Sequence, residues 1–235
     1  MNHRIGALAG FAFLLIGLVG FGVAPPPPVP DAETTEWIRW YTENPGGIQA
    51  YAYLSGVTIL ALLVWFGGLR AHVWRGADAA PLAPIATIGL SVLATGLLIG
   101  VGTSSAIAMR IDELGDDVVL FGSIVGGVMV GAAEFGVAAL MGAVSAEARR
   151  RGSLPNWLVL LGVVGAVVAM GAAAGVATDG DFVTPAISGS WLIMTVWIVA
   201  TSVVMWKGSS DSAGGERETD GAIGQRAPAT SALGG

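Results

Sequence analysis

The run VVLFGSIVGGVMVGAAEFGVAALMGAV occupies positions 118–144 and contains a single ionisable side chain, Glu134. A helix of about 20 apolar residues crosses the hydrocarbon core of a bilayer, which is roughly 30 Å thick. This run exceeds that length by several residues. It therefore predicts a transmembrane helix, and the acidic residues before it and the basic residues after it mark its two ends.

Five further stretches have a similar length and apolar character, and loops that carry most of the charges separate them. The six predicted spans are 5–24, 48–69, 85–109, 118–144, 155–177 and 187–206. Of the 235 residues, 54% are hydrophobic and only 12% are charged, whereas a soluble domain has about 25% charged residues. We therefore expect an all-α, polytopic membrane protein in the lipid bilayer, with residues 1–207 forming a bundle of six transmembrane helices.

The basic residues predict the orientation of the spans. Nine of the eleven Lys and Arg residues fall on one side, and only Arg39 and Arg110 fall on the other. The larger group consists of Arg4, Arg70, Arg75, Arg149, Arg150, Arg151, Lys207, Arg217 and Arg226. We therefore predict that both termini are cytoplasmic. We also expect the membrane to be the plasma membrane of a bacterium. The alternative is that the first span is a cleaved signal peptide, because Gly22 and Ala24 fit a cleavage site.

Two segments outside the spans have distinct compositions. In the outer loop 25–47, consecutive prolines precede a short helix, which we expect Asp31 to cap and Asn-Pro-Gly-Gly at 44–47 to end. Its residues Trp37, Trp40 and Tyr41 share one face, which is typical of an anchor in the membrane interface. A platform for an outer ligand or partner is the alternative. Residues 208–235, with seven glycines and no aromatic residue, predict a disordered cytoplasmic tail.

Glycine pairs spaced by four residues occur in four of the six spans. Within lipid, small residues allow helix backbones to approach closely, so such pairs indicate packing faces. The pairs are Gly6/Gly10, Gly96/Gly100, Gly127/Gly131 and Gly171/Gly175. They predict a tightly packed bundle, and they leave open whether the same faces bind a second copy of the chain or other membrane proteins.

Glu134 is the candidate site, because an ionisable group inside a span is costly and is a functional hypothesis by default. It lies about 5 Å to the cytoplasmic side of the middle of its span. No basic residue is expected at that depth, so burial favours the neutral acid. The expected hydrogen-bond partners are Ser91, Thr95 and Thr201. Two interpretations remain: a proton or cation site, or a polar link between helices.

Other membrane activities lack the residues that they need. The chain has no cysteine for thiol oxidation, no histidine within a span for haem and no mid-span lysine for a retinal Schiff base. We expect no enzyme activity, no metal, no cofactor and, with a net charge of −6, no nucleic-acid partner. The sequence favours a non-enzymatic membrane component that associates through glycine-rich helix faces. The alternative is a small proton- or cation-coupled carrier or channel that uses Glu134.

Short motifs in the first half of the chain resemble those of a known family. They are Arg-Ile-Gly-Ala-Leu-Ala-Gly at 4–10, the acidic and aromatic segment at 36–43, Tyr-Ala-Tyr-Leu-Ser-Gly at 51–56 and Phe-Gly-Gly-Leu-Arg at 66–70. In these motifs and in the layout of its first three spans, the chain resembles a family of small actinobacterial multi-pass integral membrane proteins of unknown function. The resemblance implies a multi-pass membrane protein and assigns no activity or site residue.

Overall fold

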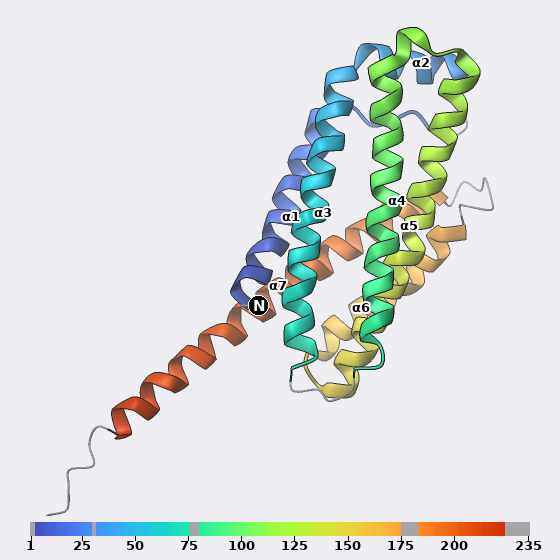
Figure 1. Ribbon diagram of the computed structural model, residues 1–235. Helices are drawn as coiled ribbons and strands as arrows, with labels where there is room; N and C mark the ends of the chain where they lie inside the picture. Colours follow the sequence, from blue (N-terminus) through green and yellow to red (C-terminus); the bar gives the residue numbers. More distant parts are fainter. Residues whose placement is uncertain (1–2, 30–31, 76–79, 175–182, 224–235) are drawn as a thin grey trace, which may run out of the picture.

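The computed structural model describes residues 3–29, 32–75, 80–174 and 183–223. The helices in these ranges are α1 (His3–Val23), α2 (Thr34–Glu43), α3 (Pro45–Val73), α4 (Ala83–Arg110), the short 3-10 helix η1 (Ile111–Glu113), α5 (Asp116–Arg151), α6 (Asn156–Ala173) and α7 (Val183–Ile223). All except α2 and η1 are long and apolar enough to cross a membrane, six in the described part of the chain (Figure 1). The predicted all-α bundle of six spans is confirmed, and the orientation of its termini stays a prediction.

The ends of the spans follow local sequence rules. Prolines occupy the first turns of α3 and α4, where a backbone N–H has no helical partner to lose. Helix α5 begins with two aspartates and ends with three arginines, which complement the helix dipole. Gly152 then adopts a left-handed conformation with φ of 64°, and its N–H bonds to the last carbonyls of the helix. This glycine therefore sets the point where the chain turns from α5 towards α6.

The six spans form a closed ring in which each helix packs against two neighbours. The order around the ring is α1, α3, α4, α5, α6, α7 and back to α1. In the interior, Trp65 of α3 and Trp197 of α7 are fully buried and meet edge to face, with ring centroids 5.7 Å apart. This aromatic pair therefore fills part of the interior of the ring.

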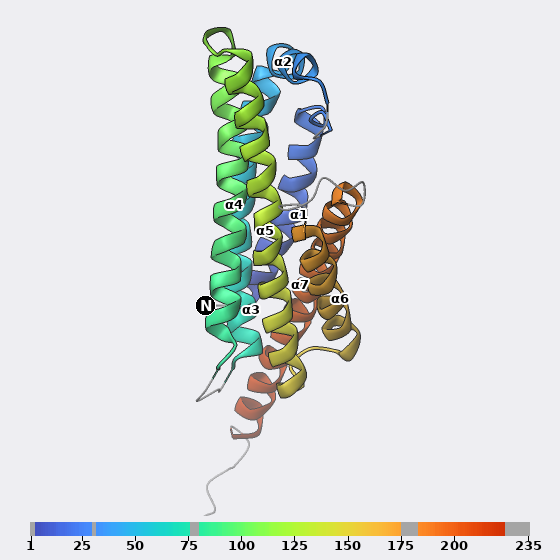
Figure 2. The same ribbon diagram turned by 90° about the vertical axis from the view of Figure 1, so that its right-hand side faces the viewer.

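The spans differ in length. Helix α5 has 36 residues and α6 has 18, which correspond to lengths of about 54 Å and 27 Å at the helical rise. One end of α5 therefore extends beyond α6, and Figure 2 shows that it also extends beyond the start of α7. Helix α2 lies at that end and packs against α3, α4 and α5.

The aromatic face of α2 packs on this end of the bundle. Tyr41 is fully buried, and its hydroxyl oxygen accepts a hydrogen bond from Ser123 of α5 at 3.3 Å. Trp37 and Trp40 pack against the same buried cluster. The predicted anchor in the membrane interface is therefore wrong for Tyr41. The long helices α3, α4 and α5 offer this side chain a protein surface, which the sequence pattern alone did not reveal.

The predicted end of the last span differs from the structure. Helix α7 does not end near residue 207 but continues to Ile223, so the first part of the predicted disordered tail is helical. Extending an existing helix needs no new nucleation, and no proline interrupts this segment before Pro228. The remaining tail, 224–235, lies outside the described residues, as does Asp31, the expected cap of α2. The residue that directly precedes α2 is Glu33.

Candidate functional site

Glu134 lies on α5 with its side chain fully enclosed by the bundle. The hydroxyl of Ser190 on α7 donates a hydrogen bond to Glu134 Oε2 at 2.6 Å. Trp191, the next residue of α7, also approaches the carboxyl group. The other oxygen, Oε1, is buried and has no hydrogen-bond partner within the described part of the chain. Glu134 therefore links α5 to α7 through one oxygen and leaves the other oxygen unpaired.

The structure pairs Glu134 with Ser190 and places the three expected partners elsewhere. Ser91 and Thr201 each donate a hydrogen bond to a carbonyl of their own helix, at 3.0 Å and 2.8 Å. Thr95 is exposed on α4, as is Ser91. The prediction of these partners is therefore wrong, although Glu134 itself is buried among the helices as the sequence indicates.

The unequal helix lengths explain why the partner is Ser190. Antiparallel packing puts Gly162 of α6 beside Ser145 of α5. Glu134 precedes Ser145 along α5 by as many residues as Ala173, the last residue of α6, follows Gly162. Glu134 is therefore level with the end of α6, and the residues that return from that end belong to the beginning of α7. A partner near the start of α7 follows from this register.

Two of the predicted glycine pairs lie in close contacts within the molecule. A Cβ added to Gly96 of α4 would lie 2.7 Å from a backbone oxygen of α5, and one added to Gly100 would lie 2.9 Å from Val130. In the same way, a Cβ added to Gly6 of α1 would lie 2.6 Å from the Cα of Gly68 on α3. These glycines let the helix backbones approach as predicted.

The other two predicted glycine pairs do not both lie in such contacts. No heavy atom lies within 4 Å of a Cβ added to Gly127 or Gly171. Gly131 is buried, and Gly175 lies outside the described residues. Gly127 and Gly171 therefore leave open space on the outside of α5 and α6.

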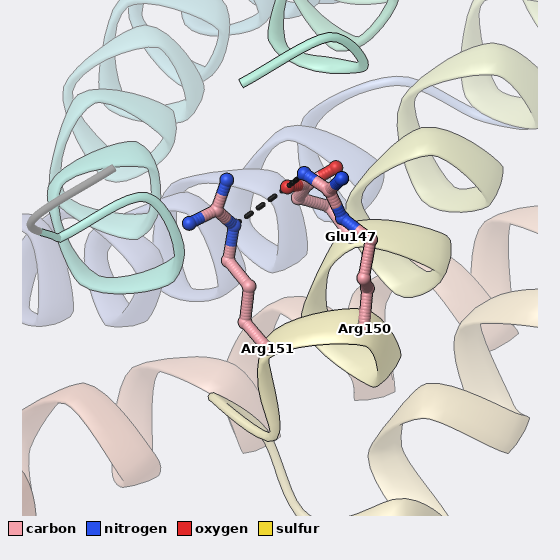
Figure 3. Close-up of polar contacts among 3 residues, drawn as sticks. All are labelled: Glu147, Arg150 and Arg151. Carbon is pink, nitrogen blue, oxygen red and sulfur yellow. Dashed lines mark hydrogen bonds and ion pairs between the residues drawn. The ribbon is translucent and has the colours of Figure 1, made fainter. Parts of the chain in front are cut away.

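A second buried carboxylate, that of Glu147, lies near the end of α5 (Figure 3). Its Oε1 accepts hydrogen bonds from Arg150 Nη2 at 2.5 Å and from Arg151 Nε at 2.6 Å. A buried carboxylate is costly unless it is paired, so the two guanidinium groups stabilise it in this position. The predicted span stops at 144 and misses Glu147. Its spacing of three and four residues from two arginines is the sequence signal that identifies this ion pair.

Basic side chains from α1 and α3 gather at the same end of the bundle. The rings of His3 and His72 meet edge to face with centroids 5.8 Å apart, and the guanidinium of Arg75 contacts His3 Nε2. The ring of His72 also bonds to the backbone of Ser153, which follows Arg151 by two residues. These contacts join the ends of α1, α3 and α5. No sequence spacing identifies the group, because its members come from distant parts of the chain.

Comparisons with known proteins add no assignment to this geometry. No family model, curated protein or solved structure matches the chain. The resemblance to small actinobacterial membrane proteins therefore stays a prediction from short motifs, and the function is inferred from the arrangement of the residues themselves.

Proposed function

We propose that the protein is a non-enzymatic membrane component that acts by associating with a second copy of itself or with other membrane proteins. The observation that carries this proposal is the enclosure of Glu134. Its carboxyl group is fully buried and bonded to Ser190 of the neighbouring α7. This arrangement is typical of a polar link between membrane helices. A residue used in this way stabilises the bundle. We therefore assign association to the helix faces that point outward from the bundle.

Gly127 marks the face that we propose for association. It precedes Glu134 along α5, and Glu134 is level with the end of α6, so α6 does not cover this part of α5. A Cβ added to Gly127 would have open space around it, and Ile124, one turn away, is exposed. A glycine with open space beside it allows the backbone of a partner helix to approach closely.

Replacing Gly127 by leucine is expected to abolish this association and to leave the fold intact. The new side chain fills the space that a partner backbone needs, and the added Cβ meets no atom of its own bundle. The measurement is energy transfer in vesicles between two populations of the protein that carry different labels. Each label is attached to an introduced cysteine, because the natural chain has none.

Gly17→Leu is the matched control, since Gly17 is an open glycine of α1 that belongs to no GxxxG pair. We expect this variant to associate like the natural protein. Undiminished energy transfer in Gly127→Leu would remove this face from the proposal. An equal loss in both variants would instead indicate a general effect of a bulky side chain on the surface of the bundle.

One atom favours a second function, that of a small proton- or cation-coupled carrier or channel. Glu134 Oε1 is buried and without a hydrogen-bond partner within the described residues. An unpaired carboxyl oxygen inside a membrane bundle is where a transported proton or cation would bind.

Flux measurements separate the two functions. Under our first proposal, vesicles that contain the natural protein or Glu134→Gln both pass protons and alkali cations at the rate of protein-free vesicles. Glutamine keeps an oxygen that accepts the hydrogen bond of Ser190, so this variant retains the link between α5 and α7. Flux by the natural protein that falls to background in Glu134→Gln would assign the carrier function instead.

We also propose that both termini are cytoplasmic and that the membrane is a bacterial plasma membrane. The nine-to-two distribution of Lys and Arg residues supports this orientation. Helix α1 packs between α3 and α7 in the ring, with Gly6 against Gly68. This packing supports α1 as a retained span and not a cleaved signal peptide.

A further inference from the structure

We propose that a basic cluster at the end of the bundle where α1 begins and α5 ends binds the phosphate group of an anionic phospholipid. We call this group the phosphate cluster. It consists of His3, His72, Arg75, Glu147, Arg150, Arg151 and Ser153. Neither the proposed association face nor Glu134 belongs to it, so this site is independent of both functions proposed above.

The phosphate cluster carries more positive than negative charge. Its three guanidinium groups accompany one carboxylate, that of Glu147, which is bonded to Arg150 and Arg151 (Figure 3). The guanidinium of Arg75 contacts His3, another basic side chain. An anion placed beside two basic groups stabilises both, and a guanidinium presents a planar set of N–H donors that matches a phosphate group. The charge and shape of this end therefore favour a phosphate ligand.

A polar atom of the phosphate cluster is not used by the protein. Ser153 Oγ is buried and has no hydrogen-bond partner within the described residues. Because a guanidinium only donates, His3 Nε2 accepts from Arg75, and the proton of the neutral ring is then on Nδ1. Arg75 is exposed, and apart from its contact with His3 its N–H groups have no partner among the described residues. The cluster thus combines an exposed guanidinium with a buried hydroxyl that has no partner within the described residues.

The phosphate cluster lies at the depth of lipid headgroups. His3 begins α1, and His72 lies in the last turn of α3, so both flank apolar spans. Trp206, near the end of the apolar part of α7, is exposed, and the guanidinium of Arg4 lies 5.9 Å from the centroid of its ring. Exposed tryptophan rings and arginines are typical of the membrane interface. Basic pockets between spans at this depth suit the headgroups of anionic lipids, so we assign a lipid as the occupant.

The test is a titration of the purified full-length protein, in a neutral detergent, with dihexanoyl-phosphatidylglycerol. The readout is the midpoint of thermal unfolding, which we expect to rise with the lipid and to saturate. Arg75→Gln should weaken the apparent affinity by about tenfold or more, since it removes a charged hydrogen-bond donor to the phosphate. Arg75→Lys, which keeps the charge and loses the planar donor set, should have an intermediate affinity.

Arg149→Gln is the matched control, because Arg149 is an exposed arginine in the last turn of α5 and lies outside the phosphate cluster. It should weaken the affinity by about fivefold or less, the effect of one charge near an anionic surface. An equal loss in Arg75→Gln and Arg149→Gln would overturn the site.

Two further ligands identify the source of the phosphate group. Dihexanoyl-phosphatidylcholine has the same acyl chains without net charge, and we expect it to produce no saturating rise. An equal rise with this lipid would overturn the assignment of an anionic ligand. Inorganic phosphate has the charge without the chains, and a saturating rise with phosphate alone would overturn the assignment of a lipid in favour of a soluble anion.

Discussion

Replacing Trp197 by alanine is expected to lower the free energy of unfolding by about 3 kcal/mol, the lower end of the range for such truncations in soluble cores. The Trp197 side chain is fully buried, packs edge to face on Trp65, and donates from Nε1 to the carbonyl oxygen of Leu158 at 3.2 Å. Lipid tails are as apolar as the interior of the bundle, so little hydrophobic transfer energy is lost. The cost arises from the missing van der Waals contacts around the cavity.

The measurement is unfolding in mixed micelles by titration with sodium dodecyl sulfate, followed by the loss of helical circular dichroism. Trp157→Ala is the control, because Trp157 of α6 is 57% exposed. Its effect should stay within about 0.5 kcal/mol, as for surface substitutions in general. If both variants lowered the free energy of unfolding by similarly small amounts, this result would contradict the close packing of Trp65 and Trp197 in the interior of the ring.

The spans could be predicted from the sequence because the bilayer imposes a length and excludes charge. Each of the six apolar runs corresponds to one long helix. The ends were less predictable, because hydropathy marks where apolar residues stop and not where the helix stops. Helix α5 continues past 144 through Glu147 to Arg151, since the ion pairs allow the carboxylate to remain buried.

Contacts between helices could not be predicted in the same way. Glu134 was identifiable because a carboxyl group within an apolar run is rare, but its partner depends on how far α6 extends along α5. Tyr41 packs against Ser123 because α5 extends to meet α2. Both contacts depend on the relative lengths and register of the helices. Periodicity within one helix contains no information on the register between two helices.

The second large effect is expected at Gly136, where α4 and α5 approach most tightly through their backbones. A Cβ added to Gly136 would lie 2.4 Å from the nitrogen of Leu93 and 2.5 Å from the carbonyl oxygen of Gly89. Both neighbours are backbone atoms, which cannot rotate away, so the two helices must separate. Overpacking of this kind costs about 1–3 kcal/mol for alanine. We therefore expect Gly136→Ala to lower the free energy of unfolding by that amount, and Gly136→Val to lower it further, in the same titration.

Gly127→Ala on the same helix separates this steric effect from helix propensity. No heavy atom lies within 4 Å of a Cβ added to Gly127, so alanine there should be neutral or stabilise the helix by up to about 1 kcal/mol. The two substitutions are chemically identical, and only the distance to α4 differs. Equal stabilities would mean that α4 and α5 do not pack at this distance.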